Sequence, residues 1–393
     1  MKPLSGIRVI ELATFVAAPS CGRNLAYLGA DVIKVEALAG DVYRKFTVYT
    51  HGEPVVFDAL NGQKKSVVMN LKDPDALYWF KKLLQTSDVF LTNFRESALK
   101  KLGIDYDSVK ALKPDLIYAH FSGYGPKGPL SSYPGFDSTA FAVRSGLYRD
   151  FVPPESEPNT HITGFGDMIS GLALSLNILA ALSLRARTGK GERIECSLNE
   201  TAAWALMMPM AYEQCTSRYC RKEGDPVDIA NASVKCGDGE WLYYGCGTIK
   251  QWNELCSAIG CGQLVDDPRC KTLNDVILNT PDIKDLIFKH FLARSAEEWI
   301  RILREHDVPC ERHRHIREMA SDEQLIANGF IQPMEYSGGR VMLPNPPLLM
   351  ESLPSYNGGH GPLLGEHTDE LMKELGCTEE ALERMKQFGT VIG

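Results

Sequence analysis

The residue best placed for chemistry is Asp167, which lies in the segment GFGDM at residues 164–168. This segment joins a glycine-rich loop to a strongly apolar stretch with the pattern of a helix. An aspartate at such a junction is typical of a helix N-cap, and the pattern alone favours that structural role. Gly164 and Gly166, however, leave the surroundings of the carboxylate open to close approach by a ligand. A carboxylate held against a reactive carbonyl can act as a nucleophile and form a covalent anhydride or ester.

Other catalytic and nucleotide-binding motifs are missing from the sequence. It contains no GxSxG serine motif, no HExxH zinc motif and no paired-carboxylate motif. The turn at residues 13–19 (ATFVAAP) lacks the glycines of a GxGxxG dinucleotide loop, and no GxxxxGK[ST] phosphate loop occurs. Glu36 could mimic a ribose-binding acid and His367 could act as a base, but a surface carboxylate and a structural histidine are the more typical interpretations.

The cysteines and charges exclude further classes. Eleven cysteines include no CxxC pair, and Cys310, His313 and His315 have no second half with zinc-site spacing. We therefore predict no metal site and expect small buried thiols kept reduced in the cytosol. Lys plus Arg number 42 against 50 for Asp plus Glu, giving a net charge of −8. Such an acidic balance argues against nucleic acid and against anionic membranes as partners.

The ends and the apolar segments indicate a cytoplasmic protein. The N-terminus MKPLSGIRVIEL enters a strand pattern directly and lacks the apolar region of a signal peptide. The longest apolar stretch, residues 168–184, carries four polar side chains and predicts a buried helix rather than a membrane span. With 393 residues, 44% of them hydrophobic and 23% charged, the chain is long enough for two or three well-packed domains.

The elements that must position Asp167 alternate between strands and helices in the first third of the chain. Strand patterns occur at 6–12, 31–36, 88–91 and 115–121, with helical patterns at 19–28, 72–86 and 97–102 between them. This order implies an α/β fold with a mostly parallel, Rossmann-like sheet, which would bind ligands in loops at the carboxyl ends of its strands. Residues 122–166 are expected to form long functional loops. The apolar helix that follows should end near Thr188, before Gly189, and a strand should return at 193–198.

The character of the sequence changes near residue 220, which predicts a second domain. A charged, loop-like segment precedes strand signals at 241–244 and helical patterns over roughly 251–306. We therefore predict a large domain over residues 1–221 and a smaller α+β domain over 222–320. Residues 336–364 are expected to be extended, and residues 368–388 helical.

Segments over nearly the whole chain resemble, in the same order, the class III coenzyme A transferases, the superfamily of formyl-CoA transferase and carnitine CoA-transferase. Within that family the sequence is most similar to the 2-hydroxyacyl-CoA transferases of the cinnamoyl-CoA:phenyllactate type. The matching segments are PLSGIRVIEL (3–12), LGADVIKVE (28–36), KKSVVMNLK (64–72), DVFLTNF (88–94), FSGYGPKGP (121–129), PGFD (134–137), the stretch from GFGD (164–167) to RTGKGERIECSL (187–198), and LGEHTDELMKELG (364–376).

The resemblance implies a covalent role for Asp167. Its carboxylate would attack the donor thioester to form a mixed anhydride, and the released CoA thiolate would convert this to an aspartyl-CoA thioester. The acceptor acid would then repeat the sequence in reverse. CoA is thus a substrate moiety, and no permanently bound cofactor is implied. Backbone amides at Gly166, Gly245 and Gly247 are candidates for stabilising the oxyanions, although the glycine run at 243–247 is shorter than the family's.

The resemblance also implies a set of CoA contacts. Lys72 and Lys101 suit phosphate groups, although an isolated lysine is more commonly part of a solvated helix face. Ala37 stands where formyl-CoA transferase has an arginine, so the contact on the adenine side must differ. The positions that match family CoA contacts are Phe15, Val16, Ala17, Met69, Lys72, Asn93, Phe94 and Lys101.

Family members form interlocked homodimers, with the small domain inserted and the C-terminal segment returning to the large domain. The resemblance therefore implies that residues 321–393 return to the large domain and that this chain forms such a dimer. Its other partners would be acyl-CoA and carboxylic acid substrates.

Two alternative functions remain open. A racemase of the same fold uses a histidine in a GHD motif as a base, but this chain has Gly135-Phe136-Asp137 there. Phenylalanine cannot move a proton, which favours the transferase and leaves Asp137 as a structural or loop-ordering carboxylate. A non-catalytic CoA-binding protein would keep Lys72, Asn93 and Lys101 but would not need Asp167.

The acid substrates are predicted only by class. Transfer between monocarboxylic acids is expected, with a 2-hydroxy acid as one candidate acceptor. The methionines at 207–210 would be equally typical of an ordinary helix core. Residues that could line an apolar acyl pocket are Phe136, Phe141, Met207, Met208 and Met210.

Overall fold

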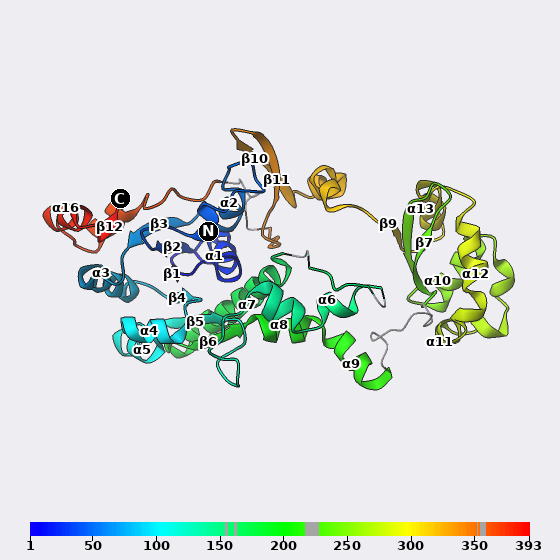
Figure 1. Cartoon of the computed structure of the whole chain (residues 1–393), viewed down its shortest axis with the longest axis horizontal. Coiled ribbons are helices and arrows are strands. Elements are labelled where there is room, and N and C mark those ends of the chain that lie inside the picture. Colours follow the sequence, from blue (N-terminus) through cyan, green and yellow to red (C-terminus); the bar gives the residue numbers. More distant parts are fainter. Residues whose placement is uncertain (154–155, 161–162, 217–227, 352, 354–358) are drawn as a thin grey trace. The chain divides into compact units, whose positions relative to one another are not determined.

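The computed structural model describes residues 1–153, 156–160, 163–216, 228–351, 353 and 359–393. It divides into two compact units (Figure 1). The larger comprises Met1–Cys220 together with Asp322–Gly393, and the smaller comprises Arg221–Ser321. The boundary predicted between residues 221 and 222 lies outside the described residues.

The larger unit is built on a seven-stranded sheet in the order β12-β3-β2-β1-β4-β5-β6. All neighbouring strands are parallel except β12, which pairs antiparallel with β3. From β3 to β6 the order is that of the doubly wound dinucleotide-binding fold. The predicted α/β class with a large parallel sheet is confirmed. The strands are β1 (Arg8–Leu12), β2 (Asp31–Glu36), β3 (Lys65–Met69), β4 (Val89–Thr92), β5 (Ile117–Ser122), β6 (Arg193–Ser197) and β12 (Val391–Ile392).

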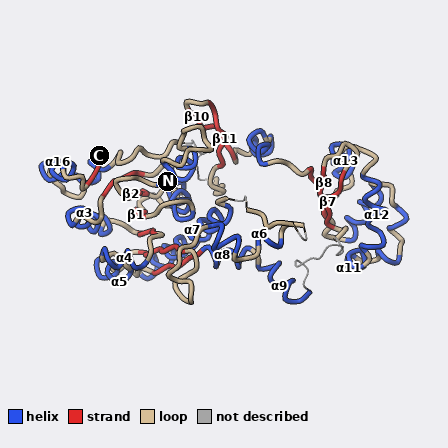
Figure 2. The backbone as a smooth tube through the Cα atoms, viewed as in Figure 1, coloured by secondary structure: helices blue, strands red, loops and turns tan. Residues whose placement is uncertain are grey.

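Helices cover both faces of this sheet (Figure 2). Because successive strand residues point to opposite faces, neighbouring residues of one strand pack against different helices. Val9 packs among residues of α1 and α7, whereas its neighbour Ile10 packs among residues of α3, α4, α5, α15 and α16. The strands and helices predicted in the first third of the chain are present. These helices are α1 (Ala17–Tyr27), α7 (Phe165–Thr188), α3 (Pro74–Gln85), α4 (Glu96–Leu102), α5 (Tyr106–Leu112), α15 (Thr368–Glu374) and α16 (Glu379–Gln387).

Four charged side chains form a buried network beneath the ends of β1 and β2. The Lys34 Nζ lies 3.0 Å from Glu11 Oε1 and 2.9 Å from Asp41 Oδ2, while the Lys64 Nζ lies 2.7 Å from Glu11 Oε2. All four are essentially excluded from solvent. Burial lowers the pKa of Lys34, but the charges of Glu11 and Asp41 outweigh it, so the pKa is raised overall. At Lys64 burial outweighs the attraction of Glu11 and lowers the pKa to about 8, so Lys34 is the more firmly charged of the two lysines.

The same two lysines hold the loop that follows β1. Lys34 donates to the carbonyl of Ala13 at 2.8 Å, and Lys64 donates to the carbonyl of Pro19 at 2.8 Å. The start of the loop after β1 and the first turn of α1 are thus tied to the buried network.

Glu36 corrects an expectation from the sequence. It is buried rather than a surface carboxylate, and it pairs with Arg44 at 2.7 Å and accepts a hydrogen bond from Ser66 at 2.7 Å. Burial of the strand end and the arrival of Arg44 from the next loop explain the difference.

Helix α7 packs closely on α1 through one face only. A Cβ on Gly171 would lie 1.9 Å from Ser20 Oγ, so only glycine permits this approach. The opposite face exposes Met168, Leu172 and Leu176, the last to 69%. The expectation of a buried helix therefore holds for one face. In the described part of the chain, α7 alone is long and apolar enough to cross a membrane by length and composition.

Shorter elements complete the larger unit. Residues 336–364, predicted to be extended, include β11 (Gly339–Pro344). This strand forms a hairpin with β10 (Ile331–Tyr336), which lies almost entirely before that segment. The Tyr336 hydroxyl donates to Asp58 in α2 at 3.0 Å, which ties this hairpin to the large sheet's helices. The remaining helices are α2 (Val55–Asn61), α6 (Leu147–Asp150), α8 (Leu198–Ala205), α9 (Met207–Thr216) and α14 (Glu323–Ala327).

The smaller unit is an α+β arrangement with its own core. An antiparallel sheet in the order β7-β8-β9 packs against helices around the fully buried Trp252, Tyr244 and Phe291. The elements are β7 (Asn231–Lys235), β8 (Trp241–Gly245), β9 (Cys310–Arg312), α10 (Ile249–Ala258), α11 (Leu273–Leu278), α12 (Thr280–Phe291) and α13 (Ala296–Glu305).

The buried network yields a stability prediction. Lys34→Met leaves buried Asp41 without its cation and Glu11 with Lys64 alone, so urea unfolding should show a loss of about 3–5 kcal/mol. Lys65→Met is the matched control, because the neighbouring Lys65 is 30% exposed and pairs with Asp31 and Glu370 at the surface. That substitution should cost less than about 1 kcal/mol. Equal losses in the two variants would contradict a special role for the buried charges.

Candidate active site

A cavity of about 1290 Å³ opens in the larger unit beyond the carboxyl ends of the neighbouring strands β1 and β4. Its walls come from the loops after β1, β4 and β5, the segment at 42–46, the loop at 131–138 and the start of α7. In open α/β sheets the strand order reverses at such a point, and a crevice forms outside the carboxyl ends of the strands. The cavity therefore lies at the position predicted for ligand binding.

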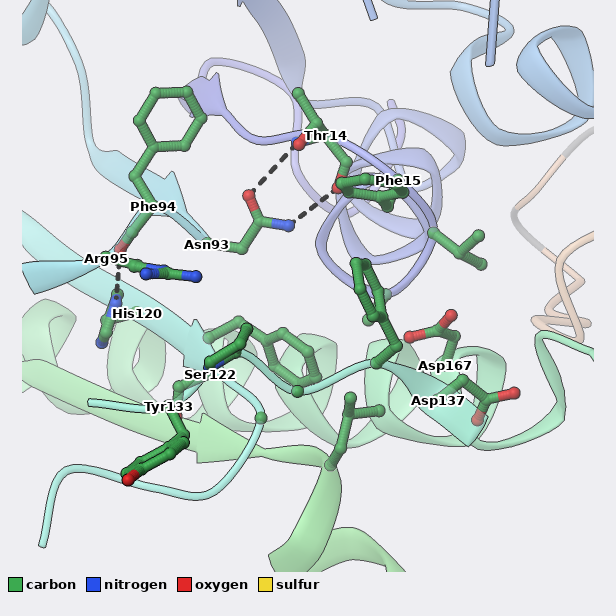
Figure 3. Close-up of a pocket in the computed structure, with 18 of the residues that line it drawn as sticks. Thr14, Phe15, Asn93, Phe94, Arg95, His120, Ser122, Tyr133, Asp137 and Asp167 are labelled. Carbon is green, nitrogen blue, oxygen red and sulfur yellow. Dashed lines mark hydrogen bonds between the residues drawn. The ribbon is translucent and has the colours of Figure 1, made fainter. Parts of the chain in front are cut away.

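The loop after β1 enters the cavity in a strained conformation. Phe15 has φ of +67°, in the left-handed region that side chains other than glycine avoid. Two hydrogen bonds stabilise the loop: the Thr14 N–H donates to Asn93 Oδ1 at 3.2 Å, and the Asn93 Nδ2 donates to the Thr14 carbonyl at 2.7 Å (Figure 3). The Phe15 ring meets the Phe136 ring edge-on, with centroids 5.4 Å apart.

The start of α7 differs from the pattern-based expectation. The N-cap is Gly164, with φ of +78°, and Asp167 lies in the first helical turn. Asp167 is thus not the N-cap. The helix begins earlier because Gly164 accepts the left-handed conformation and because Asp137, from a different segment, accepts the Gly164 N–H at 2.7 Å.

Asp137 lies directly beneath this helix start. Its side chain is only 8% exposed, and its Oδ1 is buried without a hydrogen-bond partner among the described residues. A Cβ on Gly166 would lie 2.5 Å from Asp137 Oδ1 and 2.2 Å from the Phe141 ring. Packing therefore requires glycine at position 166. Gly166 itself is buried and does not line the cavity.

Asp167 carries the strongest electrostatic perturbation in the cavity. Burial and the negative charge of nearby Asp137 together raise its pKa from 3.8 to about 7. Figure 3 shows the two carboxylates side by side. The half-buried Asp167 therefore exists in protonated and ionised forms near neutral pH, which is typical of a reactive carboxyl group.

The opposite side of the cavity carries charges of both signs, with the cations Arg95, Lys100 and Arg193 beside the acids Glu96, Asp107 and Glu195. His120 has Nε2 2.9 Å from the Phe94 carbonyl oxygen and Nδ1 2.9 Å from Glu195 Oε2, and Arg193 pairs with Glu195 at 2.6 Å. Burial lowers the pKa of His120, but the hydrogen bond and charge of Glu195 outweigh it and raise the pKa overall. Figure 3 places Arg95 and His120 across the cavity from Asp167.

Most predicted contact residues meet in this cavity. Met69 does not, because it is buried in the core, where β3 pairs with β12. Lys72 and Lys101 are exposed and lie outside the cavity wall, which Lys100 joins instead. Gly245 and Gly247 belong to the smaller unit. The predicted residues in the wall are Phe15, Val16, Ala17, Asn93, Phe94, Phe136 and Asp167.

Other residues in the predicted acyl pocket lie elsewhere. Phe141 is buried under α7, and Met207, Met208 and Met210 are exposed on α9. The structure adds wall residues that the sequence analysis missed, among them Tyr43, Arg95, His120, Arg193 and Glu195. His120 and Glu195 are register partners on β5 and β6, a signal visible only once the strand order is known.

The cavity can accept an extended ligand with an anionic part near the cations and a reactive carbonyl near Asp167. Within the described ranges, no group of three or more His, Cys, Asp or Glu side chains is arranged to hold a metal ion.

Comparisons with known proteins identify relatives along the full chain. Residues 4–368 match the family described as CoA-transferase family III. The chain is 34% identical over 397 residues to (R)-2-hydroxy-4-methylpentanoate CoA-transferase of Clostridioides difficile, covering 99% of each chain. It is 31% identical to cinnamoyl-CoA:phenyllactate CoA-transferase of Clostridium sporogenes, covering 98% of this chain and 96% of the relative. A CAIB/BAIF family protein from Brucella suis has a similar structure, with a TM-score of 0.79, 28% identity and coverage of 95% and 99%.

The raised pKa of Asp167 predicts a pH-dependent cost to folding. When a carboxyl has a higher pKa in the folded chain than in the unfolded chain, its ionisation destabilises the fold. For Asp167 this loss of stability develops as the pH rises from its ordinary pKa of 3.8 to about 7. Asp167→Asn removes this cost, so its gain in unfolding free energy over the native chain should grow from pH 4.5 to pH 8. Urea unfolding of both proteins at several pH values measures this gain. A difference that does not change with pH would contradict the raised pKa.

Proposed function

Because this chain belongs to CoA-transferase family III, we propose that it moves coenzyme A from an acyl-CoA donor to a free carboxylic acid through Asp167. The chain is an enzyme of the CoA-transferase class, as its sequence segments predicted. The observation that carries the mechanism is the half-buried Asp167 carboxylate, with its raised pKa, in the wall of the cavity.

The transfer uses four displacements. An Asp167 oxygen attacks the donor thioester carbon, the C–S bond breaks, and CoA thiolate leaves behind a mixed anhydride. The thiolate then attacks the aspartyl carbonyl carbon, which releases the donor carboxylate and leaves an aspartyl-CoA thioester. The acceptor carboxylate attacks this thioester to form a second anhydride and free the thiolate. The thiolate finally attacks the acceptor's acyl carbon, which gives acceptor-CoA and regenerates the Asp167 carboxylate.

The environment of Asp167 suits this role. A carboxylate with a pKa of about 7 is more basic than an ordinary aspartate and is a correspondingly stronger nucleophile. Ionised Asp167 also lies beside the negative charge of Asp137, so converting it to a neutral anhydride or thioester relieves repulsion between the two groups. The thioester bond energy is conserved through each displacement, which explains how the reaction proceeds without an energy source.

The polarity of the cavity orients coenzyme A. Main-chain groups at 15–17 and the Asn93-Phe94 turn would contact the pantetheine arm. Arg95 and Lys100 lie on the cationic side and suit phosphate oxygens. Lys72 and Lys101 would reach a phosphate only if part of coenzyme A extends beyond the cavity wall.

The surroundings of Asp167 favour an apolar monocarboxylic acid. Phe15, Val42 and Phe136 line the cavity, whereas its lysine and arginine side chains come from α4, β6 and the turn before α4. A second carboxylate on the substrate would lie near Asp137 without a cation to pair with it. Together with the names of the two curated relatives, this supports a branched or aryl 2-hydroxy acid as acceptor.

A covalent-adduct measurement tests the reaction. Intact-protein mass after mixing with branched and aryl acyl-CoAs should show an added CoA or acyl group, which Asp167→Asn should lack while still binding CoA. Steady-state transfer by that variant should fall by at least about 10³-fold, since the nucleophile is gone. Deuterium exchange at the substrate α-carbon without an adduct would overturn the transferase in favour of a racemase. Binding without adduct or exchange would favour a non-catalytic CoA-binding protein.

The same assay decides the acceptor class. The chain should use 2-hydroxy-4-methylpentanoate and phenyllactate in preference to glutarate, because only glutarate brings a second charge into the apolar region. A preference for glutarate would contradict the proposed apolar acid site.

We also propose that a second copy of the chain covers the exposed apolar face of α7. Trp204 and Met208 extend this apolar surface onto α8 and α9, and large exposed apolar patches mark interaction sites. The expected interlocked homodimer should have twice the chain mass of 43.6 kDa by light scattering. A monomer at micromolar concentration would contradict it.

A further inference from the structure

Tyr43 presents an unused hydroxyl to the cavity that contains Asp167. It lies in the single turn η1 (Val42–Arg44) and lines the cavity. Its ring is half-buried and meets Phe46 edge-on, with centroids 5.8 Å apart. In the part of the chain that the structure describes, the Tyr43 hydroxyl has no hydrogen-bond partner, so it is available to a bound substrate.

The turn that carries Tyr43 is held firmly from both sides. Asp41, buried against Lys34, accepts the Tyr43 N–H at 3.0 Å. On the other side, Arg44 pairs with Glu36 at 2.7 Å and donates to the Pro362 carbonyl at 2.8 Å. A donor fixed in this way needs little reorganisation during a reaction, which is the property of groups that stabilise transition states.

Tyr43 and Asp167 line the same cavity, and the charge of Asp167 acts on the Tyr43 phenol. Burial, and then the negative charges of Asp167, Asp41 and Asp137, raise the pKa of Tyr43 above 10. Its phenol therefore keeps its proton at neutral pH and remains a hydrogen-bond donor.

In the loop after β1, the three residues that follow Thr14 supply no side-chain donor. Phe15, Val16 and Ala17 line the cavity, and none of these side chains carries an N–H or O–H group. Each displacement at Asp167 develops negative charge on a carbonyl oxygen, which requires a nearby donor in a site with little water.

We propose that the Tyr43 hydroxyl is a catalytic hydrogen-bond donor to an oxyanion on the side-chain carbonyl of Asp167. This oxyanion forms when CoA thiolate attacks the Asp167 anhydride and when the acceptor acid attacks the aspartyl-CoA thioester. The inference rests on the proposed function. Tyr43 keeps its proton throughout: the attacking atom forms a bond to the carbonyl carbon, the carbonyl electron pair moves to oxygen, and Tyr43 stabilises that charge until the leaving group departs.

Tyr43→Phe removes only the hydroxyl and is the direct test. Loss of one oxyanion donor should lower kcat by about 10²–10³-fold, with KM for acyl-CoA changed by less than about 3-fold. Tyr49→Phe is the matched control, because the Tyr49 ring also meets Phe46 edge-on but is 84% exposed. That control should keep native kcat.

Rapid-mixing mass spectrometry separates this inference from the proposed function. In Tyr43→Phe the aspartyl-CoA adduct should still form but should appear and decay more slowly than in the native chain. No adduct in the native chain would refute the proposed function itself. A normal adduct with native rates in Tyr43→Phe would overturn only the role of Tyr43.

Substrate comparison separates charge stabilisation from substrate recognition. The loss should be equal for 2-hydroxy-4-methylpentanoate and for 4-methylpentanoate, which lacks the hydroxyl. A loss confined to the 2-hydroxy acid, or to KM alone, would overturn the proposal and assign Tyr43 to recognition of the substituent.

If Tyr43→Phe fails to fold, 3-fluorotyrosine at position 43 provides the test, since it keeps the shape and makes the hydroxyl a stronger donor. Its kcat should then equal or exceed that of the native chain, and a loss as large as that expected for phenylalanine would overturn the role.

Discussion

The buried attraction between Glu11 and the two lysines Lys34 and Lys64 is the interaction on which the site depends. Removing four charges from water costs more than a surface ion pair returns, so the network contributes little as a stabiliser compared with an apolar core. Its value lies in geometry. The lysines fix one carbonyl at the start of the loop after β1 and another in the first turn of α1, and Asp41 extends the same network to the turn that carries Tyr43. The loop after β1 and the turn at 42–44, which form two walls of the cavity, are thus both held by one buried cluster of charges.

A second constraint sets the reactivity of Asp167. A helix N-terminus favours a negative charge and would by itself lower the pKa of a carboxyl in the first turn. Burial and the neighbouring Asp137 act in the opposite direction and prevail. Asp137 can occupy that position because it accepts the Gly164 N–H and because Gly166 leaves room for its other oxygen. The two glycines therefore contribute to reactivity through space and backbone conformation, and not only through access for a ligand.

The cavity is electrically asymmetric, and this asymmetry is compatible with the family to which the chain belongs. The lysine and arginine side chains of the wall come from α4, β6 and the turn before α4, where Glu96, Asp107 and Glu195 accompany them, whereas aromatic side chains and the acids Asp137 and Asp167 surround the start of α7. A ligand with several phosphates at one end and an acyl group at the other has one favourable orientation in such a cavity. The resemblance seen in eight segments of the sequence is confirmed by the family match over residues 4–368.

The sequence by itself determined the α/β class, the first strands and helices and the family, because these depend on local apolar patterns and contiguous motifs. It also singled out Asp167 as the candidate nucleophile. It missed β3 and β12: the first is a short strand that starts with a lysine, and the second exists only through pairing with β3. Only the tertiary structure decided that Glu36 is buried, that Gly164 rather than Asp167 caps α7, and that Lys100 rather than Lys101 faces the cavity. The pairing of His120 with Glu195 and the approach of Asp137 to Asp167 likewise join residues 75 and 30 positions apart. Burial, pKa and direction of a side chain depend on such distant neighbours, and no local pattern specifies which of them will meet.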